Sequence, residues 1–240
     1  MKAAIFIVLY GNEASIERGL EATLTKATEG LPIHAVDNHY PMWSDGFVNR
    51  ISKQYNITIH DLGSNVGLVP ALNYLNETVP TDYQLLIEGD SYAGSSGWDK
   101  AILDVLQTGQ SVWATIHNRI SYEDMSGRTG CYHVNIAGHP CTVPLSPVMN
   151  SISGHSTEWV NKHKGYADEN NYYGGSEVKM WDRLNQQGNE KWVFIDDAFE
   201  VSRCDLRDID DEIYTKYKNA HAIGPVSERF KGSFEEYLKK

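Results

Sequence analysis

The sequence has few cysteines and no long apolar run, and both absences exclude classes of protein. The three cysteines, Cys131, Cys141 and Cys204, lack metal-site spacing, and their odd number is typical of reduced thiols in a cytoplasmic protein. No apolar run reaches the roughly 20 residues that a membrane-spanning helix needs. We expect the apolar residues 3–9 to form a buried strand rather than a signal peptide, because a charged Glu13 follows soon after.

Basic residues are also scarce. The chain of 240 residues has 21 Lys and Arg against 32 Asp and Glu, which gives a formal net charge of −11. A protein that binds nucleic acid through its phosphates needs a basic stripe, and none is visible in the sequence. The charge therefore disfavours a nucleic-acid partner, including a DNA base as a substrate.

Neither of two glycine-rich loop motifs that bind nucleotides in other enzymes follows the first apolar run. The segment Tyr10-Gly11-Asn12-Glu13 stands where a Rossmann dehydrogenase has Gly-x-Gly-x-x-Gly. A nucleotidyltransferase that makes sugar nucleotides would have a basic, glycine-rich loop at the same place. The sequence therefore argues against both classes.

What is present in the first half is an alternation of strand and helix patterns. Continuous or alternating apolar runs predict strands at 3–9, 33–36, 57–61, 83–88 and 111–116. Apolar residues at helical spacing predict helices at 13–27, 44–54, 69–75 and 98–106, the first capped by Asn12. This order predicts an α/β fold with a mostly parallel sheet, helices on both faces and ligands at the carboxyl ends of the strands.

The second half is less regular. Residues 117–153 are rich in Gly, Pro, Ser and His, which predicts an irregular substrate-facing segment or a small extra sheet. Helices are expected at 157–163 and 176–187, strands at 191–195 and 199–203, and two short helices beyond 208. We therefore divide the chain into a domain of residues 1–205, with halves 1–116 and 117–205, and a helical extension of residues 206–240.

Polar residues follow several of the predicted strands. They are Asp37, the turn Gly63–Gly67, and the pair in Glu88-Gly89-Asp90; Glu177 opens a later helix after Gly174-Gly175. An acidic residue at a strand end often only caps the next helix. Sugar transfer from a nucleoside diphosphate, however, needs a divalent cation held by carboxylates and a base for the attacking hydroxyl. Glu88-Gly89-Asp90 has the form of a carboxylate site for the cation, and Glu177 is the candidate for the base.

These motifs, in this order, resemble those of family-2-type inverting glycosyltransferases with the GT-A fold. The matching segments are Ile5 to Glu13, Val36-Asp37-Asn38, Ser64 to Leu68, Leu86 to Asp90, Gly165 to Asp168, and Gly175 to Val178 with Arg183-Leu184. The resemblance covers roughly residues 3–200. Departures are Leu9-Tyr10-Gly11 in place of Pro-x-Tyr, Glu88 in place of Asp, and Ser176-Glu177 in place of Glu-Asp.

The resemblance implies roles for individual residues. Tyr10, Asn12 and Glu88 would contact the donor, Asp37 would accept the ring N–H of its base, and Asn65 and Gly67 would shape the turn beside the nucleotide. Asp90 would be the main ligand of Mn²⁺ or Mg²⁺, with Glu88 and a downstream histidine, His221, completing the site. Glu177 would be the general base.

The expected function is therefore metal-dependent transfer of a hexosyl or pentosyl group from a nucleotide sugar to an acceptor hydroxyl, with inversion. The acceptor could be a glycan, a protein or a small molecule. The alternative is a GT-A domain that has lost catalysis and only binds glycans or nucleotide sugars. The aromatic residues Trp159, Tyr172 and Tyr173 could either stack on an acceptor sugar or belong to the core.

Overall fold

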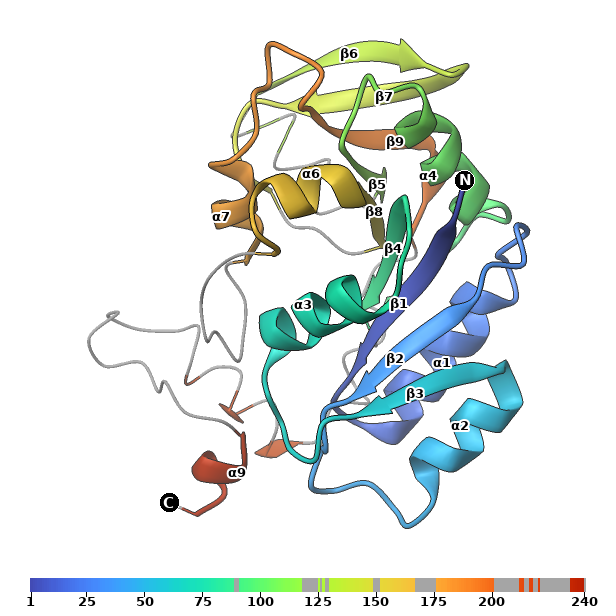
Figure 1. The fold of residues 1–240 in the computed structure, drawn as a ribbon, viewed down its shortest axis with the longest axis vertical. Coiled ribbons are helices and arrows are strands. Elements are labelled where there is room, and N and C mark those ends of the chain that lie inside the picture. The colour runs from blue at the N-terminus through green and yellow to red at the C-terminus, as the bar shows by residue number, and fades with distance from the viewer. Residues whose placement is uncertain are drawn as a thin grey trace.

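The structure is a computed structural model, and it describes residues 1–88, 91–117, 125, 127, 130–148, 152–166, 176–200, 212–213, 216–217, 220 and 234–239. The strands are β1 (Ala3–Leu9), β2 (Ile33–Asp37), β3 (Ile57–Asp61), β4 (Tyr83–Glu88), β5 (Trp113–His117), β6 (Cys131–Ile136), β7 (His139–Pro144), β8 (Ser153–Ser156) and β9 (Trp192–Phe199). The helices used below are α1 (Glu13–Leu24), α2 (Phe47–Tyr55), α3 (Leu68–Thr78), α4 (Trp98–Gln107), α6 (Thr157–Lys162), α7 (Ser176–Trp181) and α9 (Phe234–Tyr237) (Figure 1).

The described strands form one sheet of nine, in the order β3-β2-β1-β4-β8-β5-β9-β7-β6. The first four strands of the chain are mutually parallel, and β5 is parallel to β9. The antiparallel pairs all involve strands from the second half of the chain: β8 lies between β4 and β5, and the β6–β7 hairpin joins β9. The predicted α/β sheet is therefore present, and the second half extends it.

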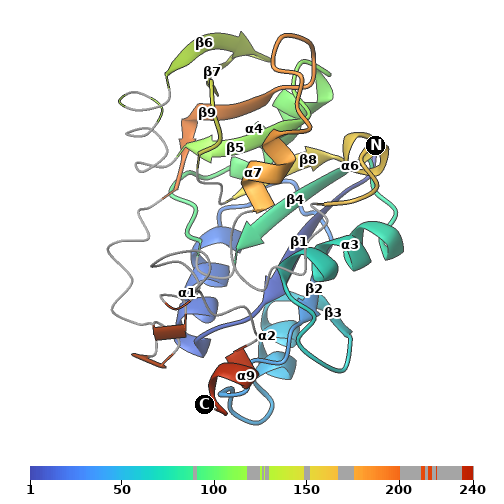
Figure 2. The same cartoon turned by 90° about the vertical axis from the view of Figure 1, so that its left-hand side faces the viewer.

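Helices cover both faces of the sheet, as the alternating pattern predicts. On one face, α1, α2 and α4 bury apolar side chains such as Ile16, Ile51 and Ile102 against the strands. On the other, α3, α6 and α7 do the same, with Val160 and Met180 among the buried residues. Figure 2 shows α1 and α3 on opposite sides of β1. A sheet buried on both faces favours strands with continuous apolar runs, which is the pattern of β1 and of Leu85–Ile87 in β4.

The predicted elements of the first half are confirmed with small shifts at their ends. The apolar start of the chain is β1, a buried strand, and Asn12 caps α1 by accepting hydrogen bonds from Ala14 and Ser15. The helix expected to run to residue 27 ends at Leu24, and the next is α2 at Phe47–Tyr55. These elements could be predicted because their apolar spacing is a local property of the sequence.

One prediction in the second half is wrong: the two strands expected at 191–195 and 199–203 are a single strand, β9, over Trp192–Phe199, and residues 201–203 lie outside the described part. Asp196-Asp197 interrupts the apolar pattern but not the strand. Thr142 donates to Asp196 Oδ2 at 3.0 Å, and His139 lies 3.0 Å from the Asp197 carboxylate. Each carboxylate thus has one partner on the neighbouring β7.

Two further segments differ from expectation. The helix expected at 176–187 ends at Trp181, and Gln187 N donates to Asn185 Oδ1 at 3.2 Å in the turn that follows. Such local side-chain bonds compete with helix formation. The segment expected to be irregular or a small sheet contains the β6–β7 hairpin, whose turn residues Ala137 and Gly138 both have positive φ, as two-residue hairpin turns require.

The composition-based expectations concern the membrane and the cysteines. Among the helices that the structure describes, none combines the length and the apolar character required to cross a bilayer. Cys131 and Cys141 are free thiols, and Cys204 lies outside the described residues. Burial raises the pKa of the Cys141 thiol to about 12, so this group is an unreactive part of the core.

Candidate active site

The residues expected at strand ends meet at one edge of the sheet. In the register of the parallel strands, Leu9 pairs with Asp37, Asp37 with Asp61, and Val8 with Glu88. Carboxyl ends of parallel strands bind ligands in this type of sheet because the connecting loops converge there. The topology therefore places Asp37 and Glu88 on the two sides of β1.

At the end of β2, Asp37 organises the loop that follows it. Its Oδ1 accepts a hydrogen bond from His39 N at 2.8 Å, and the His39 ring lies 2.7 Å from Asp61 Oδ1. The pKa of Asp61 is lowered, first by the hydrogen bond from Gly63 N and then by the one with His39. The second oxygen of Asp37 has no hydrogen bond among the described residues, so it can accept one from a ligand.

The turn Gly63–Gly67 is built by two asparagine side chains. Asn65 Oδ1 accepts from Gly67 N at 3.0 Å, and Asn38 Oδ1 accepts from Val66 N at 2.8 Å. Gly67 has a φ of 87°, a backbone conformation that glycine adopts without strain, and it precedes α3 directly. The turn-shaping geometry expected of Asn65 and Gly67 is present, while their contact with a nucleotide stays a prediction. Asn38, which the sequence did not single out, ties the turn to the end of β2.

Tyr10, in the loop after β1, is oriented by a residue from the far end of the sequence. Its hydroxyl donates to Glu235 Oε1 at 3.3 Å, and Asn65 Nδ2 donates to Glu235 Oε2 at the same distance. The Tyr10 ring packs edge-on against Tyr40, with 5.1 Å between centroids. Two residues expected at the donor are thus joined by a carboxylate from α9, and nothing in the local sequence of α9 indicated this.

Asn12 has a structural role in this structure. Its side-chain oxygen accepts from Ala14 N at 2.9 Å, which satisfies an N–H at the start of α1 that has no partner within the helix. Only the amide nitrogen of Asn12 is therefore left for the expected contact with the donor.

At the end of β4, Glu88 is the one predicted metal ligand within the described residues; Asp90 and His221 lie outside them. No group of three His, Cys, Asp or Glu close enough to hold a metal ion occurs in the described part of the chain. A carboxylate oxygen nevertheless suits Mg²⁺ or Mn²⁺, and Mg²⁺ commonly binds through one or two carboxylates together with substrate phosphates. The chemistry of Glu88 therefore fits a cation that a nucleotide helps to bind.

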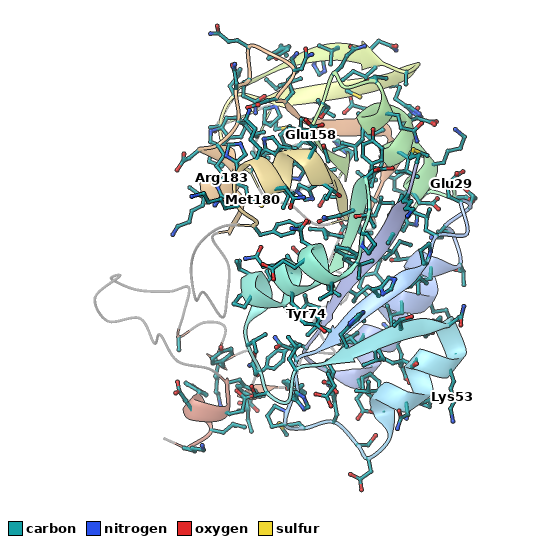
Figure 3. The ribbon with its side chains drawn as sticks, in the orientation of Figure 1. Glu29, Lys53, Tyr74, Glu158, Met180 and Arg183 are labelled. Carbon is teal, nitrogen blue, oxygen red and sulfur yellow. The ribbon has the colours of Figure 1, made fainter. Side chains whose placement is uncertain are left out.

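The expected base, Glu177, falls in the first turn of α7, but its side chain lies outside the described part. Met180 holds this helix against the sheet, 5% exposed, and Arg183 donates to Gly165 O at 2.6 Å (Figure 3). These contacts fix the position of α7 on the face that also holds α3 and α6. Asp168 and Glu169, the other acids in this region, lie outside the described residues.

A second group of titratable residues lies at the same edge, beyond β4. His117 ends β5 and Asp196 lies near the end of the parallel strand β9. Burial raises the pKa of Asp196, and the hydrogen bond from Thr142 partly opposes this shift. Burial lowers the pKa of His117, and the charge of Asp196 opposes that change. No periodic pattern indicates this group, because His117 and Asp196 lie on different strands and Thr142 lies on a third.

Two further histidines of the second half have structural surroundings. His155 is fully buried, with rings of Trp113, Trp159 and Tyr166 about it, and burial lowers its pKa to about 3. His139, at the start of β7, pairs with Asp197 of the neighbouring strand β9. Of the two roles considered for Trp159, the structure supports the one in the core, since its side chain is 3% exposed. Tyr172 and Tyr173 lie outside the described residues.

Comparison with known proteins identifies the fold. No protein-family model matches the sequence, and no curated protein matches it. Among solved structures, mannosyltransferase PcManGT from Pyrobaculum calidifontis, in complex with GDP-Man and Mn²⁺, is similar with a TM-score of 0.65 at 12% identity, over 100% of this chain and 64% of its own. S. aureus TarS 1–349 with UDP-GlcNAc gives 0.58 at 13% identity, over 95% and 69%.

A third similar structure is GalNAc-T7 with UDP, GalNAc and Mn²⁺, with a TM-score of 0.60 at 10% identity, over 100% of this chain and 57% of its own. This chain thus spans less than two thirds of PcManGT and of GalNAc-T7. At such identities the similarity establishes the fold alone. That fold is GT-A, the one expected from the sequence.

Proposed function

We propose that this protein is a glycosyltransferase that moves a sugar from a nucleoside diphosphate to an acceptor hydroxyl. The observation that supports this best is the carboxyl edge of β1, β2 and β4. Tyr10, Asp37 and Glu88 lie at this edge, where sheets of this type bind their ligands. The GT-A fold adds support, because the similar solved structures are glycosyltransferases with nucleotide sugars or nucleotides bound.

In this proposal the donor lies across the carboxyl edge. The base and ribose face the loops after β1, β2 and β3, where Asp37 accepts the ring N–H of the base and Tyr10, Asn12, Asn65 and Gly67 line its surroundings. The diphosphate lies toward β4 and Glu88. A charge-assisted hydrogen bond to Asp37 would contribute about 1.5–3 kcal/mol to donor binding.

We infer that Mn²⁺ or Mg²⁺ binds with the donor, held by Asp90 and Glu88 and completed by His221. When bound, the cation would stabilise the negative charge that develops on the leaving diphosphate. Glu88 supports this assignment through its place at the end of β4, two residues before Asp90 in the pair of acids. Its longer side chain could reach the cation through a water molecule.

Glu177 is proposed as the general base. It would take the proton of the acceptor hydroxyl while the hydroxyl oxygen forms a bond to the anomeric carbon and the bond from that carbon to the diphosphate breaks. A single displacement of this kind inverts the anomeric configuration, since no covalent sugar–protein bond forms. A carboxylate at a helix N-terminus is stabilised as the anion, so the bound substrates must desolvate it to make it basic.

The acceptor, the transferred group and the compartment belong to the proposal as well. A hexosyl or pentosyl group would pass to a glycan, a protein side chain or a small molecule, in the cytoplasm. The acidic net charge disfavours a DNA base as acceptor. Residues 1–116 would serve mainly the donor, residues 117–205 the acceptor, and residues 206–240 would extend the domain.

The test is a thermal-shift screen of UDP-, GDP-, dTDP- and CDP-sugars, each with Mn²⁺ and with EDTA. A ligand at 100 times its Kd stabilises the folded state by about 2.7 kcal/mol, so the matching donor should raise Tm in the presence of the cation. Release of free sugar from that donor would separate an enzyme from a domain that only binds nucleotide sugars. A protein that none of the four donors stabilises would contradict the proposal.

A further inference from the structure

Glu235 lies where two loops of the proposed donor site meet. Its two carboxylate oxygens accept hydrogen bonds from Tyr10 Oη and from Asn65 Nδ2, each at 3.3 Å. These partners stand 225 and 170 residues away along the chain, in the loop after β1 and in the turn before α3. Figures 1 and 2 both show α9 beside the carboxyl ends of β1, β2 and β3. The fold of the chain therefore brings α9, which carries Glu235, to these loops.

Aromatic packing fixes α9 in this place. Phe234, which precedes Glu235, is fully buried and stacks on Tyr40, with 5.4 Å between the centroids and 8° between the planes. Tyr217 is 2% exposed and packs against Phe234 at 5.1 Å. A residue beside such an anchor has a defined position, so the Glu235 carboxylate is held at the loops rather than free in solvent.

The carboxylate still has capacity to bind a ligand. An ionised carboxylate offers about four lone-pair sites, and the two contacts with Tyr10 and Asn65 use two of them. Glu235 is partly exposed, and its carboxylate has no other hydrogen bond among the described residues. Both of its protein partners donate to it, which leaves the site as an acceptor that needs a donor group from the ligand.

Charge decides which part of a nucleotide this carboxylate can face. A diphosphate near Glu235 would be repelled by a like charge, whereas the uncharged nucleoside offers N–H groups on the base and O–H groups on the ribose. Tyr10 and Asn65, the residues that Glu235 joins, are also those proposed to surround the nucleoside.

We propose that Glu235 is a nucleoside-binding residue of the donor site, whose carboxylate accepts a hydrogen bond from an N–H of the base or a hydroxyl of the ribose. This inference rests on the proposed function. It adds that residues 234–237 complete the donor site, which the strand-end motifs of the first 200 residues do not include.

The experiment compares Glu235→Ala and Glu235→Gln with Glu236→Gln, a matched control at the exposed neighbouring position of α9. The probes are GDP, UDP, dTDP and CDP, and inorganic pyrophosphate, each with Mn²⁺, and binding is measured by calorimetry together with the Tm of each ligand-free variant. Pyrophosphate separates contacts with the nucleoside from contacts with the diphosphate and the cation.

We expect Glu235→Ala to weaken binding of the preferred nucleoside diphosphate by roughly tenfold or more, the loss of one charge-assisted hydrogen bond. Glu235→Gln should weaken it less, because its amide oxygen still accepts one hydrogen bond. Pyrophosphate binding should stay within about twofold of wild type for both variants, and Glu236→Gln should match wild type for every probe.

Three results would overturn the inference while the proposed function stands. They are a wild-type affinity for the nucleoside diphosphate in Glu235→Ala, an equal loss for nucleotide and pyrophosphate, and tighter nucleotide binding, which would mean that α9 obstructs the site. If wild type bound none of the four nucleotides, the proposed function and this inference would both fail.

Discussion

The side-chain oxygen of Asn38 accepts a hydrogen bond from the backbone N–H of Val66 at 2.8 Å. Asn38 is 3% exposed, and its own N–H donates to Leu9 O at 3.2 Å, so this one residue connects the ends of β1 and β2 with the turn before α3. The donor site proposed here consists of these same three segments. Its shape therefore depends on a residue that does not itself need to touch the donor.

Replacing Asn38 should destabilise the protein. Asn38→Ala leaves the Val66 N–H without its acceptor, which should lower the free energy of unfolding by about 1–3 kcal/mol in urea denaturation. Asn38→Asp keeps an acceptor at the same place and serves as the control, with a smaller loss. Equal stability of wild type and Asn38→Ala would show that water replaces this contact without cost.

Asp37 should determine donor affinity. Asp37→Ala should weaken nucleoside-diphosphate binding about tenfold or more, while binding of pyrophosphate with Mn²⁺ stays nearly unchanged, because only the base contact is lost. Asp82→Ala is the control, since Asp82 precedes β4 at the other edge of the sheet and is exposed. An unchanged nucleotide affinity of Asp37→Ala in calorimetry would mean that Asp37 only holds the loop through His39.

The metal assignment makes a graded prediction. Asp90→Ala should abolish the Mn²⁺-dependent rise in Tm that a nucleoside diphosphate causes, and Glu88→Ala should reduce it less, because a ligand acting through water contributes less. Asp82→Ala, at the opposite end of β4, should leave the rise as in wild type. A full Mn²⁺-dependent rise in Asp90→Ala would contradict the assignment.

Glu177 should be required for turnover. Glu177→Gln keeps the volume and removes the basic charge, so we expect near-normal donor binding and a fall in kcat of roughly 10²–10⁴. Glu158→Gln is the control, since Glu158 is exposed in the first turn of α6 and loses the same helix-terminal charge. The product of the wild-type reaction should be inverted, as its NMR coupling constants would report.

Turnover of Glu177→Gln within about threefold of wild type, or a product with retained configuration, would require another base. Asp196 would then be the first residue to replace, since burial raises its pKa and it lies near the same edge of the sheet. Asp168, Glu169 and Asp182 would follow.

The buried imidazole of His155 should make stability fall in acid. Burial lowers its pKa in the folded state to about 3, below the ordinary value of 6.5, so between these values the unfolded chain binds a proton that the folded chain does not. The contribution of His155 is present above pH 6.5 and is lost as the pH falls from 6.5 toward 3, by up to about 1.4 kcal/mol per pH unit. His155→Leu should flatten this decline in urea denaturation at pH 7 and pH 5, and an unchanged slope would contradict the prediction.

The sequence by itself determined most elements of the first half and the order of the strand-end motifs. The apolar run of β1, the helical spacing in α1 and the cap at Asn12 are local properties, so a window of a dozen residues suffices to predict them. The sequence also placed Asp37 and Glu88 at strand ends, and strand ends in a parallel sheet share one edge.

Only the tertiary structure decided the contacts between distant segments. β8 inserts between β4 and β5, Asp196 stays within β9 because Thr142 donates to it, and Glu235 reaches Tyr10 and Asn65. Each of these depends on partners far away in sequence, and a periodic pattern reports only the side of an element that is buried, not the element that buries it. The same limit applies to His155, whose polar side chain is enclosed by rings from β5, α6 and Tyr166.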